Sequence, residues 1–176
     1  MRDTRAGKLA IYLSTLAAFS LWSLPCMALE VRAGQSWFEQ GDFLLHPGVQ
    51  LSLENDARQS VRFEFTGRKF GYFTEMTSIL SLNFPYEILP WKSVYTSYGL
   101  SVMDEYTGYD SPTGKDESIH SMNFGVNLGI GWKVVEYKGF NARLEWNSHI
   151  FAAGLAFLYM TTARKSVLTA AIGYDL

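Results

Sequence analysis

The sequence predicts an all-β chain that folds as an antiparallel, up-and-down transmembrane β-barrel with eight strands. Three observations predict it: apolar residues alternate with small or polar residues along most of the chain, the polar positions carry charges of both signs, and aromatic residues lie near the ends of the apolar series. Alternation places the two kinds of side chain on opposite faces of a sheet. A sheet with an apolar outer face can cross a membrane only if it closes into a barrel.

The composition is that of one folded domain with no electrostatic sign of a nucleic-acid partner. The 176 residues include 15 Lys and Arg, 17 Asp and Glu, three His and one Cys, with 48% hydrophobic and 15% aromatic residues. This excludes a disordered chain, and no basic run offers a surface for nucleic acid. One cysteine excludes an intramolecular disulfide and a cysteine-based zinc site. We expect no metal and no other cofactor.

The N-terminal segment has the order of a secretory signal peptide. Basic residues precede an uncharged run from Leu9 to Leu24, and small residues follow up to Ala28. We expect cleavage after Ala28, which divides the chain into a signal peptide at 1–28 and an outer-membrane β-barrel at 29–176. An N-terminal membrane anchor is the alternative, because the apolar run is only slightly shorter than a spanning helix.

The strand signal is strongest from Met122 to Val134, where every even position is apolar and every odd position is small or polar. A helix would scatter these residues around its circumference, whereas a strand sorts them onto two faces. The eight segments with this pattern are Leu29–Trp37, Val49–Glu54, Val61–Thr66, Leu80–Phe84, Val94–Val102, Met122–Val134, Phe140–Asn147 and Leu168–Leu176.

The segments between the strands are rich in Asn, Asp, Gly and Pro, which favour turns. If the first strand rises from the periplasm, the connections after odd-numbered strands lie outside, and the longest of them is an external loop. The expected connections are Phe38–Phe43, Asn55–Gln59, Gly67–Gly71, Pro85–Trp91, Glu105–Glu117 and Val135–Gly139.

The apolar face is expected to point outward. It carries no charge in the strand centres, whereas the polar face consists of Gly, Ser, Asn, Thr and opposite charges that can close on themselves. Aromatic residues near its edges are typical of the girdles of a membrane barrel: Trp37, Trp91, Trp132, Trp146 and Tyr174. A soluble periplasmic barrel is the alternative, and it would turn Phe63, Phe124 and Leu144 inward.

The C-terminal strand carries a family resemblance. Thr169, Ala171, Tyr174 and Leu176 resemble the assembly signal of the small eight-stranded outer-membrane barrels, the family of the OmpA membrane domain, OmpX-like proteins and lipid A deacylases. Ala171 stands where Gly is usual and Leu176 where Phe is usual. The resemblance implies a monomer in the outer membrane of a Gram-negative-type bacterium, in contact with outer-membrane lipid, lipopolysaccharide and the barrel-insertion machinery.

The apolar segment Ile150–Met160 departs from the pattern because it follows a complete strand. We interpret Ala153-Gly154 as the tip of a long external hairpin, with Arg164 and Lys165 near the outer interface. A count of nine or ten strands, with a turn at Asn147-Ser148, is the alternative.

Charged side chains on the inward face are expected to plug the barrel. Eight strands leave an interior just wide enough for side chains, and buried charges are costly unless they are paired. We therefore expect a network of ion pairs and hydrogen bonds, with a narrow channel as the alternative. Its expected members are Arg32, Arg62, Glu64, Arg143 and Glu145; Glu75 and Lys133 are further charges assigned to this side.

No catalytic residue is assigned. Ser121, His149 and Glu145 share the inward parity, but the register that would bring them together is not visible in the sequence. Lipid A deacylases have a His-x-Ser spacing in an outward-facing Ser, His and Glu set, and this chain has no His-x-Ser. We expect His120, Ser148 and His149 to be polar residues of the outer rim.

The external elements are the candidate contact surface, because exposed apolar side chains often mark a partner site. The expected function is a structural or surface-interaction role through the external loops, without catalysis. An enzyme acting on outer-leaflet lipid and a narrow channel are the alternatives. The candidate contact residues are Tyr106, Tyr109, Phe151, Phe157 and Tyr159.

Overall fold

The computed structural model describes residues 30–40, 44–55, 59–86, 93–110, 117–152 and 162–176. Within this part of the chain no helix is long and apolar enough to cross a membrane. The expected signal peptide lies outside the described residues. The strands are β1 (Glu30–Gln40), β2 (Leu44–Glu54), β3 (Ser60–Phe70), β4 (Phe73–Tyr86), β5 (Val94–Tyr109), β6 (Glu117–Tyr137), β7 (Phe140–Ala152) and β8 (Thr162–Asp175).

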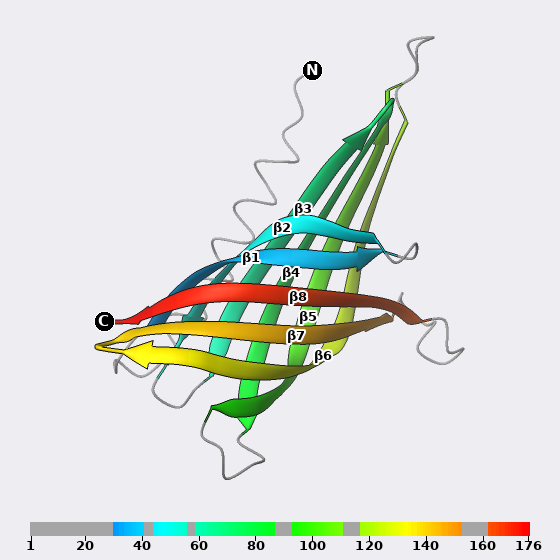
Figure 1. Ribbon diagram of the computed structural model, residues 1–176. Helices are drawn as coiled ribbons and strands as arrows, with labels where there is room; N and C mark the ends of the chain where they lie inside the picture. The colour runs from blue at the N-terminus through cyan, green and yellow to red at the C-terminus, as the bar shows by residue number, and fades with distance from the viewer. Residues whose placement is uncertain (1–29, 41–43, 56–58, 87–92, 111–116, 153–161) are drawn as a thin grey trace.

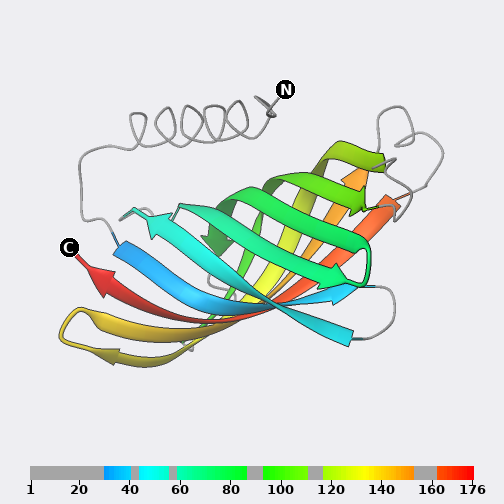
Figure 2. The same cartoon turned by 90° about the horizontal axis from the view of Figure 1, so that it is seen from above.

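These strands form one closed antiparallel barrel in up-and-down order, which confirms the predicted fold class. Each strand pairs with the next, and β1 pairs with β8 to close the wall. Figure 1 shows the strands from the side, and Figure 2 shows the first and last strands lying next to each other. Both chain ends of the barrel, Glu30 and Asp175, therefore lie at one end, which we call the terminal end. The opposite end is called the mouth.

The polar face lies inside, as predicted. Arg62 and Glu145 are 2% and 3% exposed, whereas Phe124 and Leu144 on the other face are 64% and 41% exposed. The alternative of a soluble barrel with an apolar core is therefore wrong. Trp132, Trp146 and Tyr174 are exposed on the outer face. Trp91 lies outside the described residues.

Several strands extend beyond the predicted boundaries toward the mouth. Gly67–Phe70 continues β3, and β4 begins at Phe73 instead of Leu80. Residues 105–109 and Glu117 belong to β5 and β6 and not to a loop. Alternation with apolar residues marks only the part of a strand whose outer face is apolar. Backbone pairing continues beyond it, where the outer face becomes polar. The sheet of β3 to β6 consequently rises above the remaining wall in Figure 1.

Two connections are two-residue turns. Phe70 pairs with Phe73 around Gly71, whose φ is 57°. At the terminal end Tyr137 pairs with Phe140 around Lys138 and Gly139, both with positive φ. Positive φ at both central residues is the geometry that matches the twist of a hairpin. Residues 135–137, predicted as part of this connection, belong to β6.

The seventh strand is continuous from Phe140 to Ala152. The alternative turn at Asn147-Ser148 is therefore wrong, and with it the count of nine or ten strands. Backbone pairing with β8 runs without a break through both residues. The proposed hairpin tip at Ala153-Gly154 lies outside the described residues.

Candidate functional site

A cluster of arginines and glutamates fills the lumen near the terminal end. Alternation points these side chains inward from β1, β2, β3 and β7, and each has 9% or less of its side chain exposed. Arg32 lies at the centre, with Nη1 3.2 Å from Glu145 Oε1 and Nε 3.3 Å from Glu30 Oε1. Its Nη2 also donates to Glu54.

Glu145 joins opposite walls of the barrel. It accepts hydrogen bonds from Arg32, from Arg62 and from the hydroxyl of Tyr95. Arg143 donates to Glu30 and Glu54, and its Nη1 lies 3.1 Å from Glu54 Oε2. The buried charges are therefore paired with charges of opposite sign, which offsets the free-energy cost of removing them from water.

Sequence reasoning missed four members of this interior set: Glu30, Glu54, Tyr95 and His149. Glu30 has the parity of Arg32 along β1 and Glu54 has that of Gln50 and Ser52 along β2, and Glu30 pairs with Glu54 in the β1–β2 register. Parity could therefore have identified both. Tyr95 faces Gly131, where an added Cβ would lie 2.3 Å from the tyrosine ring. The glycine makes room for the ring.

His149 lies in the lumen and not at the outer rim as expected. Its Nε2 is 3.2 Å from Glu64 Oε2, and its Nδ1 is 2.9 Å from Ser101 Oγ. Ser121, His149 and Glu145, which share the inward parity, are not brought together, because Glu145 binds arginines and Ser121 lines the mouth. Ser101, His149 and Glu64 have 2% exposure or less. Their burial leaves no approach for a lipid carbonyl in the described part of the barrel.

An apolar layer separates this polar interior from the mouth, and we call it the septum. Its five side chains are 1% exposed or less and pack against one another. Phe151 stacks on the His149 ring with a centroid distance of 5.9 Å. The septum residues are Phe38, Ile79, Met103, Phe151 and Val167.

The septum corrects one predicted contact residue. Phe151 was expected on an external surface, yet it is 1% exposed and faces the lumen. The strand continues past the predicted end, so Phe151 keeps the inward parity of Asn147 and His149. Phe157 and Tyr159 lie outside the described residues.

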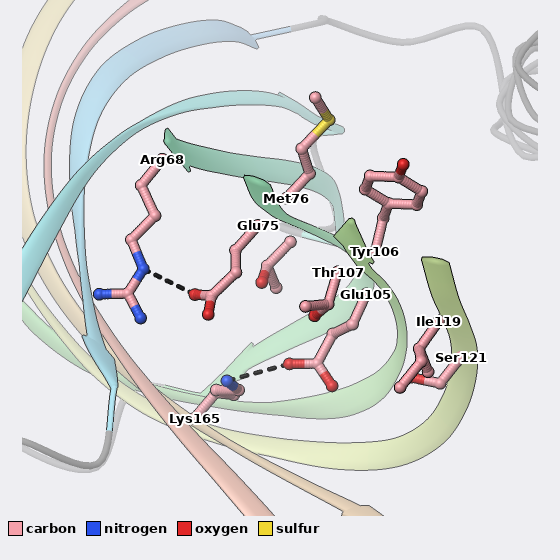
Figure 3. Close-up of a pocket in the computed structure, with 10 residues that line it drawn as sticks. Arg68, Glu75, Met76, Glu105, Tyr106, Thr107, Ile119, Ser121 and Lys165 are labelled. Atoms are coloured by element: carbon pink, nitrogen blue, oxygen red, sulfur yellow. Dashed lines mark hydrogen bonds and ion pairs between the residues drawn. The ribbon is translucent and has the colours of Figure 1, made fainter. Parts of the chain in front are cut away.

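Beyond the septum the mouth contains a pocket of about 290 Å³. Figure 3 shows two ion pairs bordering it, Arg68 with Glu75 and Lys165 with Glu105. The Arg68 Nε to Glu75 Oε2 distance is 2.6 Å, and the Lys165 Nζ to Glu105 Oε1 distance is 3.0 Å. Lys165 therefore points into the mouth, whereas Arg164 donates to Ser148 on the outer face.

Aromatic side chains gather where β3 turns into β4, and we call this group the aromatic tip. The Tyr109 ring lies 4.8 Å from the Phe73 ring and 6.5 Å from the Tyr72 ring, measured between centroids. Phe70 and Tyr72 are 79% and 56% exposed. The tip comprises Phe70, Tyr72, Phe73 and Tyr109.

Tyr106 and His120 were also singled out in the sequence. Tyr106 is 37% exposed and is one of the residues that line the pocket in Figure 3. On the outer face His120 Nε2 lies 2.7 Å from Asp104 Oδ1, with half of the His120 side chain exposed. Among the described residues no group of three or more His, Cys, Asp or Glu side chains could hold a metal ion.

Comparison with known proteins shows the fold. No protein-family model matches the chain, and no curated protein matches its sequence. A major outer membrane protein from Thermus thermophilus is 14% identical, with a TM-score of 0.56 over 86% of this chain and 100% of that chain. Two further structures match with a TM-score of 0.51, each over 85% of this chain and 97% of the other chain.

These two are the N-terminal β-barrel domain of OprF from Pseudomonas aeruginosa, at 10% identity, and Ail, the attachment invasion locus protein of Yersinia pestis, at 15% identity. At such identities the likeness concerns the fold alone. The chain has the fold of the small outer-membrane β-barrels, and the predicted resemblance in architecture is confirmed.

Proposed function

We propose that a chain with this fold is a monomeric outer-membrane protein of a Gram-negative-type bacterium, with a structural or surface-interaction role. It acts through its mouth end, without catalysis, and its interior is plugged. The proposal rests on a contrast between the two parts of the barrel. Paired charges and the septum fill the lumen, whereas the mouth presents the exposed aromatic tip. The proposed partners are outer-membrane lipid, lipopolysaccharide and the barrel-insertion machinery, after removal of the signal peptide.

The outer face supports contact with lipid. Along β6 the outward side chains from Met122 to Val134 are all apolar, and each is 43% to 64% exposed. A soluble protein rarely exposes so large an apolar surface. In a bilayer this surface meets hydrocarbon, and the closed hydrogen-bond ladder leaves no sheet edge in that layer.

Two barriers in series support a plugged interior. Arg62 of β3 reaches Glu145 of β7 across the lumen, and the septum adds a layer of five buried apolar side chains. Hydrated ions would have to displace both. A narrow channel would require a path through these contacts.

The first experiment measures conductance. Purified protein is inserted into planar lipid bilayers, and current is recorded across a range of voltages against a large porin as the positive control. We expect no steps above the noise of the bilayer. Reproducible discrete openings, at a protein dose that gives one barrel per membrane, would contradict the plugged interior and establish the channel alternative.

The second experiment tests the mouth end in cells. Bacteria expressing the chain are compared with empty-vector cells for retention on an apolar polymer surface and for outer-membrane permeability to an excluded dye. A surface role predicts higher retention that is lost in the double variant Phe73→Ser, Tyr109→Ser. The control Tyr137→Ser removes an aromatic side chain, 64% exposed, at the terminal end.

Retention that both variants keep would place the contact outside the aromatic tip and contradict that assignment. A change in permeability alone would support the structural role. Wild-type cells that differ from empty-vector cells in neither measurement, with the barrel present in the outer membrane, would contradict the proposal.

A further inference from the structure

We propose that the mouth pocket binds a small zwitterion, a solute that carries an anionic oxygen group and an ammonium group. The pocket is lined by two cations, two carboxylates, four hydroxyl-bearing side chains and two apolar side chains. Its main polar lining residues are Arg68, Glu75, Thr77, Glu105, Thr107 and Lys165. This goes beyond the proposed function, because binding of a solute does not depend on the membrane in which the barrel sits.

The carboxylates lie together on one wall. Glu75 pairs with Thr107 in the β4–β5 register, and Thr77 pairs with Glu105 two positions further along. These four inward residues therefore form a patch in which two carboxylates and two threonines alternate diagonally. The patch can accept hydrogen bonds from an ammonium group at its centre.

The cations approach this patch from its two sides. Arg68 lies on the neighbouring strand β3, directly opposite Glu75 in the register. Lys165 comes from β8, which is not adjacent to β5, so its contact with Glu105 crosses the mouth. Figure 3 shows both cationic groups directed toward the same space as the carboxylates. An anionic group placed between them would meet two donors.

These ion pairs differ from the deep network in exposure. The side chains of Arg68 and Glu75 are 39% and 34% exposed, and those of Lys165 and Glu105 are 18% and 29% exposed. Ion pairs in contact with water contribute little to stability, so a ligand can replace them at small cost. The deep pairs, almost fully buried, could not be exchanged in this way.

The charge arrangement selects the class of ligand. A purely anionic solute would gain Arg68 and Lys165 but would lie against Glu75 and Glu105, and a purely cationic solute would meet the reverse. Only a solute that carries both charges can satisfy both sets at once. Thr77, Thr107 and Ser121 can bind its uncharged polar groups.

The septum closes the pocket from below and limits the size of the ligand. Met103 and Val167 lie two positions along their strands from Glu105 and Lys165, so apolar side chains form the floor beneath the charged layer. The volume of about 290 Å³ lies at the lower end of the range for small-molecule sites. A ligand of dipeptide size therefore enters from the mouth and stops at the septum.

The test uses three solutes of nearly equal shape. Glycylglycine carries both charges, propionylglycine keeps only the carboxylate, and glycylglycinamide keeps only the ammonium group. Each is titrated into isotope-labelled barrel in nonionic detergent micelles, and amide chemical shifts are followed by NMR. We expect glycylglycine to bind at least tenfold more tightly than either analogue, with shifts concentrated at the residues of the pocket.

Two variants locate the site. Glu105→Gln and Lys165→Gln each remove one charge and should weaken glycylglycine binding about tenfold. The control Lys133→Gln breaks a comparable exposed pair, Lys133 with Glu136 at 3.0 Å, near the terminal end and should leave binding unchanged. Folding of every variant is checked by its gel mobility before and after boiling.

Equal affinities for the three solutes would overturn the proposal, as would wild-type affinity in both pocket variants. Absence of any shift at the pocket up to high millimolar glycylglycine would do the same. Because the barrel is studied in micelles, these results are independent of the conductance and cell experiments. Failure of the surface role would therefore leave this proposal standing, and the reverse also holds.

Discussion

Glu64 and His149 stand on strands that face each other across the barrel, β3 and β7, yet Glu64 Oε2 and His149 Nε2 are only 3.2 Å apart. Two side chains thus span the full width of the lumen. Arg62 and Glu145, two positions away from Glu64 and four from His149 on the same strands, repeat the crossing. The barrel is held together through its interior as well as around its wall, so substitutions in the lumen should act on the whole barrel.

The first prediction concerns Glu145. Glu145→Gln removes the carboxylate that Arg32, Arg62 and Tyr95 share. Buried Arg62 then loses its closest counter-charge, and Arg32 keeps only Glu30 and Glu54. Loss of one partner of a buried pair costs about 3–5 kcal/mol. We expect the free energy of unfolding to fall by that amount in urea titrations of the micelle-bound barrel, followed by tryptophan fluorescence.

Glu75→Gln is the matched control for this measurement, because it neutralises a partly exposed partner of an arginine. Exposed pairs contribute about 0–1 kcal/mol, so its unfolding curve should nearly coincide with that of the wild type. Similar losses of unfolding free energy in the two variants would show that the deep network contributes no more to stability than the exposed pair.

The second prediction concerns the fit between Gly131 and Tyr95. An alanine Cβ at position 131 would lie 2.3 Å from ring atoms of Tyr95, which must then move within a crowded interior. Overpacking of this kind costs about 1–3 kcal/mol. Gly131→Ala should therefore lower the unfolding free energy, whereas Gly67→Ala, whose nearest neighbour would be 3.5 Å away, should change it by less than about 1 kcal/mol. Stability losses of the same size in both variants would refute the steric explanation.

The alternation in β6 was sufficient to predict the face that each of its side chains occupies. The same parity rule applies to His149 and Phe151, which share the inward parity of Glu145, but both were expected at the outer end of the barrel because they lie beyond the predicted end of the strand. The contacts of His149 were not predictable in the same way. They depend on the stagger of the strands around the barrel, which sets the height of Glu64 relative to His149. The alternation of apolar and polar residues along each strand does not determine this stagger.

The third prediction compares arginine substitutions at two depths along the outward apolar face of β6. Leu128 and Met122 both point outward from β6 and are 56% and 52% exposed, but Leu128 lies in the middle of the apolar series and Met122 at its mouth-side end. An arginine at the bilayer midplane of a barrel costs about 2–4 kcal/mol and one near the interface about 0–1 kcal/mol. In phospholipid vesicles, Leu128→Arg should therefore be much less stable than Met122→Arg. Equal costs would show that the band is not centred on a bilayer.

The fourth prediction compares one phenylalanine of the septum with one of the aromatic tip. Phe151 belongs to the septum and is 1% exposed, whereas Phe70 belongs to the aromatic tip and is 79% exposed. Truncation of a buried phenylalanine costs about 3–5 kcal/mol because a cavity remains. Phe151→Ala should thus lower the unfolding free energy strongly, while Phe70→Ala should change it by about 0.5 kcal/mol or less.

The same pair also tests whether the septum is the only barrier. Phe151→Ala opens space in the apolar layer but leaves Arg62 joined to Glu145 in the layer toward the terminal end. We therefore expect this variant to remain non-conducting in planar bilayers despite its lower stability. Discrete openings in Phe151→Ala that are missing from the wild type and from Phe70→Ala would show that the charged network does not block ions, and that the septum alone closes the lumen.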